Sequence, residues 1–437
     1  MAVDEKIRFA GDISIDRIQL TTSSGYTQNI TNQVVAFEIY EDLFSPFISG
    51  IIAVRETLDF INLLPMVGEE YVDIKAHTPS FSNKDQIFDD QFIVYKVTNR
   101  TMAGDRNMIY EIHFISREAI VDLNKKISKS FEGKVSDIAE EILNDDLYGL
   151  ETKKSINIEP TPNGTKYISN YWSPVQNLNY LVENAKNLSG SPNYLFFENR
   201  HGFNFGSLST LNLYGVTQEF LYDGYFRDFR QDGSTIKNVE EQYKRIKEIE
   251  IPVLYDMMNK TMNGMYASKQ IDYDIVTKKY KVHTYDMLSD WDNHKHLNEY
   301  PIASQNLIRK PSQFLMHGTG YWGNFNGYKD VTNNSSSQKR VSLIEQAQMN
   351  KMIITVPGRT DYTVGSKVYI KLNKFNPIKS TDLENDYLDN IFSGNYLISS
   401  INHVIDREKH ECVMEVIKDS YIFDLNTGGV KWLFTLV

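Results

Sequence analysis

Short stretches in which apolar and polar residues alternate fill both ends of this 437-residue chain, and they restrict the folds open to it. A period of two predicts strands with one buried face. The alternation is clear at 92–97 and 110–115, and it returns from Met352 onward, ending at 411–417. Aromatic residues, which favour pleated and half-buried surfaces, make up 12% of the chain. The sequence therefore predicts a mainly β fold with α+β insertions.

The two β blocks repeat each other in order. Gly68 precedes a strand at 71–74, and Gly365 precedes one at 368–372. In each block a long polar loop, an apolar strand beginning at Phe92 or Tyr396, a short turn and a last strand follow. Unrelated antiparallel domains of similar size would also show such spacing, whereas an internal duplication explains the shared order. We expect antiparallel β-barrel domains of the same fold at 1–125 and 345–437.

Between the two β blocks the chain changes to a helical period of 3.6. One apolar stripe is formed by Val135, Ile138, Ala139, Ile142 and Leu143. Ser173, Pro174 and Gln176 form a capping box that predicts the start of a second helix. Its buried face is expected to contain Leu178, Leu181, Val182, Ala185 and Leu188, with Gly190 at its end. We expect an α+β domain with two amphipathic helices at 126–210, and an irregular, partly inserted β-rich domain at 211–344.

Charge and cysteine content exclude several classes of protein. The chain has 46 Lys and Arg against 57 Asp and Glu residues, a net charge of −11, which disfavours wrapping of nucleic acid but suits a channel that a polyanion crosses. Cys412 is the only cysteine, and we expect it to be a small buried hydrophobe on a strand face. Residues 1–10 lack the apolar core of a secretory signal, and no segment is apolar enough for a membrane helix. We expect synthesis in a reducing cytoplasm and no membrane insertion.

The search for catalytic or metal-binding motifs finds no convergent set. There is no glycine-rich phosphate loop, no Gly-x-Ser-x-Gly elbow and no His-Glu-x-x-His helix. His294 and His296 are a possible two-histidine metal arm, but their polar neighbours favour a solvated loop. The acidic pairs at 140–141 and 145–146 do not converge, because adjacent helical residues point about 100° apart. We expect no catalytic residue, no metal and no cofactor.

The C-terminal tail is strongly apolar after Gly428 and Gly429. Its large apolar residues are Trp432, Leu433, Phe434 and Leu436. Such a terminus either folds back onto its own domain or docks on a partner. The double glycine makes docking a comparable possibility, and we adopt it as the prediction.

Several segments, taken in order, resemble the central hub subunit of contractile phage tail baseplates of the T-even-like myovirus type. They are YEDLFSPFISG at 40–50, LPMVGEE at 64–70, ISREAI at 115–120, YWSP at 171–174 and FSGNYLI at 392–398. The resemblance covers about 30–210 and 350–422. Residues 223–340 match no family that we recognise.

The resemblance implies a structural role in a virion. Such hubs are trimers in which each subunit carries two domains related to the tail-tube protein, so that six similar barrels abut a six-fold tube above and a three-fold spike below. The partners implied are two further copies of the chain, the central spike protein, tail tube or tube-initiator proteins and other baseplate proteins. DNA would pass through the lumen without specific binding. The turn and small residues Pro46, Gly50, Pro65, Gly68, Gly365 and Gly394 are then determinants of the fold.

Two other classes of function remain open at this point. One is a multi-domain cytoplasmic or cell-wall-acting enzyme with β accessory domains. A weaker one is a receptor-binding or fibre protein, which more often shows repeats and glycine-rich runs. The mass in solution separates a trimeric hub from a monomeric enzyme.

Overall fold

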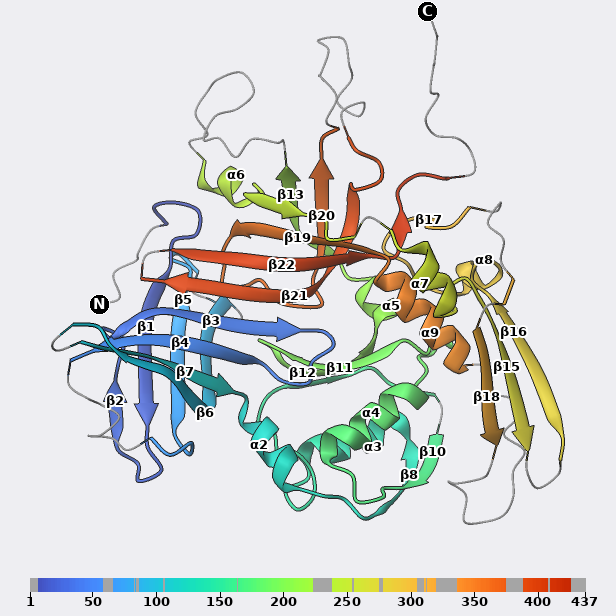
Figure 1. Ribbon diagram of the computed structural model, residues 1–437, viewed down its shortest axis with the longest axis horizontal. Coiled ribbons are helices and arrows are strands. Elements are labelled where there is room, and N and C mark those ends of the chain that lie inside the picture. Colours follow the sequence, from blue (N-terminus) through green and yellow to red (C-terminus); the bar gives the residue numbers. More distant parts are fainter. Residues whose placement is uncertain are drawn as a thin grey trace, which may run out of the picture.

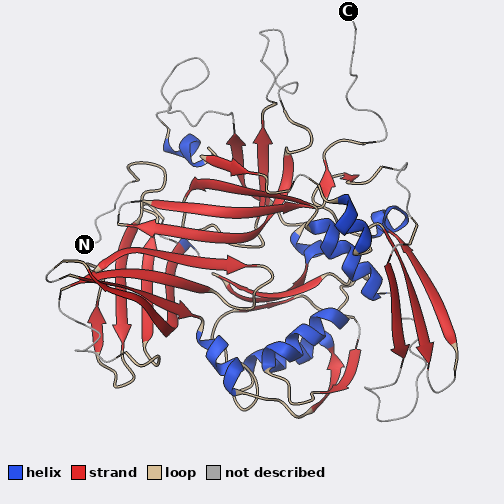
Figure 2. Cartoon of the chain, in the orientation of Figure 1, coloured by secondary structure: helices blue, strands red, loops and turns tan. Residues whose placement is uncertain are grey.

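The computed structural model describes residues 7–57, 66–81, 83, 86–104, 107–162, 164–222, 238–253, 255–274, 278–304, 310–311, 313–319, 336–374, 388–407 and 409–425. Strands dominate, and the main helices lie at two places on the rim of the central sheet (Figures 1 and 2). Within these residues no helix is both long and apolar enough to cross a membrane.

The first β block forms one antiparallel sheet. Its strands are β1 (Ser14–Thr21), β2 (Thr27–Asn29), β3 (Val34–Asp42), β4 (Ser49–Glu56), β5 (Tyr71–His77), β6 (Ile87–Met102) and β7 (Met108–Ile115). They are hydrogen-bonded in the order β2-β1-β5-β6-β7-β4-β3. One face covers a hydrophobic cluster that includes Phe37, Phe92 and Phe114, all at most 1% exposed.

The second β block continues the same sheet. Its strands are β13 (Val216–Tyr222), β14 (Glu248–Glu250), β19 (Asn350–Pro357), β20 (Lys367–Leu372), β21 (Gly394–Asp406) and β22 (His410–Lys418). The order is β14-β19-β22-β21-β20-β13, antiparallel except for the parallel pair β13–β20. Because β21 also pairs with β3, the two blocks form a single sheet of 13 strands.

The two blocks share one connectivity. We name β4 to β7 the first four-strand unit and β19 to β22 the second. In the first unit β4 pairs with β7, β7 with β6 and β6 with β5. In the second, β19 pairs with β22, β22 with β21 and β21 with β20, again all antiparallel. The predicted strand order is therefore present in both blocks. Pairings among the described strands do not close either block into a ring, so the barrel itself stays a prediction.

Each unit contains one long strand that bends at a β-bulge. The register of β6 against β7 shifts between Val94 and Lys96, and that of β21 against β22 shifts between Ile398 and Ser400. Before the bulge, β6 pairs with β5, and β21 pairs with β20. Beyond the bulge, β6 pairs within its own unit only with β7, and β21 only with β22. A bulge bends a strand and increases its twist. The bent strand thereby belongs to two parts of the sheet, whose strands cross at a steep angle in Figure 1.

A mixed α/β region lies between the two β blocks. It comprises α2 (Arg117–Asn124), β8 (Ser130–Lys134), α3 (Val135–Asn144), β9 (Ile156–Ile158), β10 (Gly164–Ile168), α4 (Pro174–Asn184), β11 (Tyr194–Asn199), β12 (Gly202–Ser207) and α5 (Leu208–Leu211). Helices α3 and α4 pack together over a core shared with β11 and β12.

The region after β13 forms a smaller sheet and short helices. Its elements are α6 (Val239–Tyr243), α7 (Met257–Met262), β15 (Ala267–Asp274), β16 (Tyr280–Asp286), α8 (Met287–Asp290), a 3₁₀ turn (Trp291–Asn293), β17 (Tyr300–Pro301), β18 (Gln313–Thr319), α9 (Ser336–Ala347) and, later in the chain, β23 (Ser420–Tyr421). Strand β15 pairs with β16 and β18.

The helix predictions are confirmed except at one end. The apolar stripe of α3 is buried throughout, and Ser173 and Gln176 form the predicted capping box of α4. Helix α4 ends at Asn184, however, and Leu188 is 81% exposed. The expectation that the helix continues to Gly190 with Leu188 on its buried face is wrong. Ala185 adopts an extended conformation that ends the helix, and Leu188 follows in the Asn187–Gly190 turn.

Gly50 offers a direct test of close packing inside the first four-strand unit. A Cβ at this position would overlap the carbonyl oxygen of Glu38 and the buried ring of Phe114. We therefore expect Gly50→Ala to lower the free energy of unfolding by about 3 kcal/mol, measured by urea denaturation. Gly215→Ala is the control, because a Cβ there meets nothing within 4 Å. Equal effects of the two substitutions would contradict the packing argument.

Candidate assembly interface

The junction between the two β blocks is a pair of strands from opposite ends of the chain. Residues 400–406 of β21 pair with 42–36 of β3 in antiparallel register. Ile405 lies opposite Phe37, and both side chains are at most 1% exposed. Ile405 belongs to the hydrophobic cluster of the first block, so the second block contributes directly to that core.

Glu41 makes a buried polar connection beside this junction. Its Oε2 accepts hydrogen bonds from Thr363 Oγ (2.5 Å) and from the Val364 backbone N–H (3.3 Å), in the loop before β20. Burial raises the pKa of the Glu41 carboxyl to about 7. A buried carboxylate is costly unless it is hydrogen-bonded, so these two bonds fix the loop against β3.

Two further connections are fully or largely buried. Thr78 and Thr360 exchange hydrogen bonds, each backbone N–H donating to the other hydroxyl at 3.1 and 3.0 Å. Glu198 on β11 accepts from the Ile48 N–H (3.0 Å) and from Ser116 Oγ (2.6 Å), and it pairs with Lys154. Burial raises the pKa of the Glu198 carboxyl. These contacts link the α/β region and both β blocks.

Each block also has a strand with an open edge that is the counterpart of one of the two strands in this junction. Strand β14 flanks β19 as β3 flanks β4, and the second half of β6 corresponds to the second half of β21. Among the described strands, β14 pairs only with β19, and residues 96–102 of β6 pair only with β7. Glu248 and Glu250 on β14 are exposed, as are Arg100 and Met102 on β6. The two edges are therefore opposite in charge.

The predicted turn residues lie in different local structures. Gly68 and Gly365 have φ of 94° and 80°, a region that favours glycine, and they precede the equivalent strands β5 and β20. Pro46 lies in the bend between β3 and β4. Gly50, by contrast, lies inside β4 rather than in a turn, where only the absence of a side chain permits close packing. The tail residues Trp432, Leu433, Phe434 and Leu436, and also Pro65, lie outside the described residues.

Gly394 begins β21 with φ of 131° and is held in place by a buried lysine. Lys418 Nζ donates to the carbonyl oxygens of Ile391 (2.6 Å) and Ser393 (3.2 Å). The ammonium also lies 4.6 Å from the centroid of the Tyr396 ring. Burial lowers the pKa of Lys418 to about 7.

The structure corrects the expectation for His294 and His296. Neither is solvated: His294 is buried, and the half-buried His296 has a side chain that is only 6% exposed. His294 contacts Ser191 Oγ (2.7 Å) and Asp290 (2.9 Å), while His296 contacts Asp419 (2.9 Å) and stacks on Trp291. Each histidine has its own carboxylate partner, and the two do not converge. The sequence did not predict these contacts, because the partners of the two histidines are remote in sequence or belong to the adjacent short helix.

A different group has the donor atoms of a metal site. His403, His410 and Cys412 lie on β21 and β22 with one potential ligand atom each, all within 4.8 Å of one another, and no other group of three meets this criterion among the described residues. Cys412 is buried as expected, but it contacts two imidazoles. The sequence carried a signal that was missed: His410, Cys412 and Lys418 all share the alternating apolar face of one strand.

Comparisons with known proteins locate the fold. No sequence-family model and no curated protein matches the chain. Among solved structures, the tail protein from Neisseria meningitidis MC58 has a TM-score of 0.54 at 9% identity, over 92% of this chain and 96% of that protein. The 43 kDa tail protein of prophage MuSo2 from Shewanella oneidensis has a TM-score of 0.52 at 10% identity, over 92% and 98%. The chain thus shares the fold of phage-type tail proteins, as the sequence resemblance predicts.

The buried Lys418 predicts a specific pH dependence of stability. The folded-state pKa is lowered to about 7 and an unfolded lysine titrates near about 10.4, so between these values the unfolded chain binds more protons. The lysine's contribution to the free energy of unfolding should therefore rise with pH in this window, by at most about 1.4 kcal/mol per pH unit. Urea denaturation at pH 7.5 and 9.5 measures the rise.

Lys418→Met should remove this rise, because the titrating group is gone. Lys371→Met, at a position where the lysine side chain is 42% exposed, should leave the rise intact. If the wild-type chain and Lys418→Met have the same slope, the lysine is not the responsible group.

Proposed function

We propose that the protein is a non-enzymatic structural subunit of a phage-type tail baseplate, and that three copies form a ring joining a six-fold tail tube to a three-fold central spike. The observation that carries the proposal is the repetition of one four-strand unit, with its bulged strand, inside a fold shared with tail proteins. Three chains with two units each supply six similar modules, which reconciles three-fold with six-fold symmetry.

The junction inside the chain supplies a template for the junction between chains. β21 and β3 join the second unit of a chain to its first unit. A ring of six modules needs the reciprocal contact, in which the first unit of one copy meets the second unit of the next. We assign this contact to β6 and β14, because they are the counterparts of β21 and β3. The contact is heterologous, as a closed cyclic trimer requires.

The register of the proposed contact follows from equivalent positions. Ile405 and Met102 are each the last paired residue before a hairpin turn. Phe37 pairs with a residue of β4, and Ile249 pairs with the residue at the equivalent position of β19. Since Ile405 lies opposite Phe37 within the chain, Met102 should lie opposite Ile249 of the next copy. Met102, now 68% exposed, would become buried, and Arg100 would lie opposite Ile251, on the strand edge that also carries Glu248 and Glu250.

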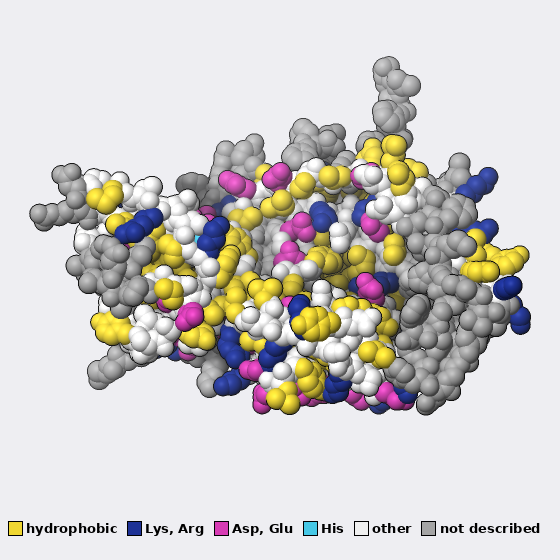
Figure 3. Space-filling model, turned by 60° about the horizontal axis from the view of Figure 1, so that its bottom comes forward, with side chains coloured by type: hydrophobic (Ala, Val, Ile, Leu, Met, Phe, Trp, Pro, Cys, Tyr) yellow, Lys and Arg dark blue, Asp and Glu magenta, His cyan; other side chains and the backbone are white. Residues whose placement is uncertain are grey.

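The remaining partners follow from this arrangement. The ring would contact a tube or tube-initiator protein on one face and the spike protein on the other, with other baseplate proteins around it. The net charge of −11 suits a lumen that DNA crosses without binding. On the face shown in Figure 3 acidic and basic side chains are interspersed. Docking of the apolar tail (Trp432, Leu433, Phe434 and Leu436) on spike or neighbour is part of the same proposal.

An enzymatic role would need a site that binds a small substrate. A polar pocket of about 580 Å³ lies where β5 and β6 meet the β11–β12 turn, and it contains Asp89, Asp90 and Arg200. Asp89 is ion-paired with Lys75 at 2.8 Å. A stable monomer that binds a small ligand in this pocket would favour the enzyme over the hub.

Reversal of one charge on each edge tests the ring. We expect the wild-type chain to have a solution mass close to three times its 50.6 kDa, by light scattering. Arg100→Glu should weaken association by about tenfold or more, because it places like charges together. Glu250→Arg should do the same, and the double variant should restore the trimer.

Lys126→Glu is the control, since it makes the same charge reversal at an exposed residue away from both edges. A monomeric wild-type chain would contradict the trimer itself. A trimer that is insensitive to both edge variants would leave the trimer intact and show that β6 and β14 do not form its contact.

A further inference from the structure

We propose that His403, His410 and Cys412 bind one Zn²⁺ ion in the core of the second four-strand unit. This inference concerns a site inside one chain, so it stands apart from the proposed ring. The three residues come from adjacent strands: His403 on β21 lies directly opposite Cys412 on β22, and His410 precedes Cys412 by two positions. All three side chains therefore leave the sheet on the same face, and each is fully buried.

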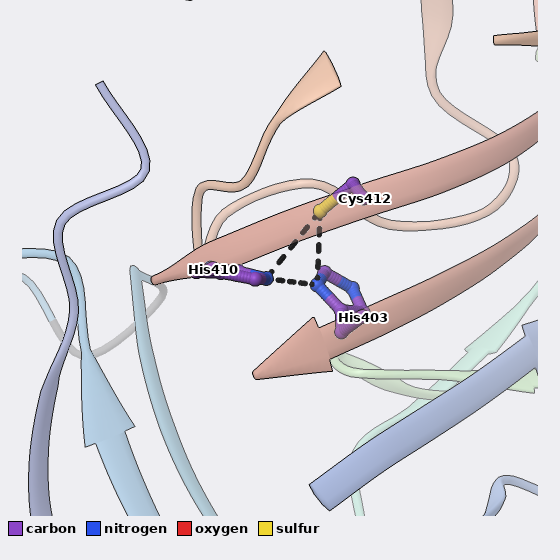
Figure 4. A group of neighbouring side chains, drawn as sticks. All are labelled: His403, His410 and Cys412. Atoms are coloured by element: carbon purple, nitrogen blue, oxygen red, sulfur yellow. Dashed lines mark hydrogen bonds between the residues drawn. The ribbon is translucent and has the colours of Figure 1, made fainter. Parts of the chain in front are cut away.

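The ligand atoms already converge on one point (Figure 4). His403 Nδ1 lies 3.0 Å from His410 Nε2, and Cys412 Sγ lies 3.3 Å from the first nitrogen and 3.4 Å from the second. A tetrahedral Zn²⁺ with ordinary bonds to nitrogen and sulfur needs ligand separations of about 3.3–3.6 Å. Only a few tenths of an ångström separate the present arrangement from that geometry.

The surroundings hold the ligands in place. The Cα of Gly358 packs against the His410 ring so closely that a Cβ there would overlap it. Phe88 contacts the His403 ring edge-on, with centroids 5.4 Å apart. Ligands whose orientation is fixed by packing lose little entropy when an ion binds. Such fixed ligands favour binding of the ion.

The second nitrogen of His403 points to the one carboxylate oxygen of Glu41 that accepts no hydrogen bond from the described residues. His403 Nε2 lies 3.8 Å from Glu41 Oε1, and neither atom has a hydrogen-bond partner among the described residues. When Nδ1 binds a metal, Nε2 must carry the proton and can donate it to Glu41. A carboxylate behind a metal-bound histidine is the usual outer contact of zinc sites. The ion would thus explain two buried atoms that are otherwise unsatisfied.

The charges also balance. The thiol of Cys412 loses its proton to solvent when the ion binds, and the thiolate, the Glu41 carboxylate and Zn²⁺ then sum to zero. Both imidazoles are fully buried, and burial disfavours the charged form, so the neutral form that binds a metal is favoured. The positive charge of Arg200 opposes a cation here, but Arg200 also interacts with Asp90, with which it lines the polar pocket.

The fourth coordination position is assigned to a water. The hydroxyl of Tyr362 is buried without a hydrogen-bond partner among the described residues, and it interacts electrostatically with Cys412. The soft sulfur ligand disfavours Ca²⁺ and Mg²⁺, which prefer oxygen.

Elemental analysis of the full-length protein, purified without chelator, tests the site. We expect about one zinc per chain, and a melting temperature that falls by several degrees when a strong chelator removes it. Cobalt substitution should give a thiolate-to-cobalt charge-transfer band. Cys412→Ser should lose the band and the effect of the chelator, whereas His113→Gln, which changes a histidine outside the group, should keep both.

Three results would overturn the proposal. They are less than about 0.1 zinc per chain with no effect of chelator, a cobalt spectrum without a sulfur band, or stoichiometric copper in place of zinc. The first two measurements use the wild-type chain, so they remain decisive even where Cys412→Ser fails to fold. A trimer without zinc would leave the proposed ring unaffected.

Discussion

Pairing between β21 and β3 is the contact on which the rest of the molecule depends. It makes two four-strand units into one sheet and places Ile405 of the second block in the core of the first. Strand edges carry unpaired N–H and C=O groups that must find partners. Here each block satisfies an edge of the other, so neither block is complete without its neighbour. The ring proposed above extends the same requirement from one chain to three.

Buried polar groups determine the relative placement of the blocks more than they contribute to the stability of the fold. Glu41, Glu198 and Lys418 each lose hydration on burial, and hydrogen bonds offset that cost only when donor and acceptor are correctly placed. A buried charge that is deprived of its partner costs far more than the pair contributes. We infer that these groups exclude alternative packings of loops and strands, while the aliphatic and aromatic core supplies most of the stability.

Local features of the fold could be predicted from the sequence, and distant ones could not. Alternation and glycine spacing indicated the repeated strand order, and the capping box at Ser173 gave the start of α4. The pairing of β21 with β3 has no local signal, because it depends on residues more than 350 positions apart. His294 was misjudged for the same reason, since its partner Ser191 is remote. Glu41 and His410 could have been identified from the sequence, because each is a polar residue on an otherwise buried strand face.

The distance in sequence between β3 and β21 also sets a waiting time during synthesis. Asn402 donates a hydrogen bond to Glu38, 364 residues earlier in the chain. At about 5–20 residues per second, a ribosome takes roughly 20–70 s to add that many residues. For this period the first block exists with the edge of β3 uncovered and with the Ile405 position in its core vacant. The nascent chain is therefore exposed to intermolecular strand addition until β21 is made, and a chaperone that covers β3 would act within this period.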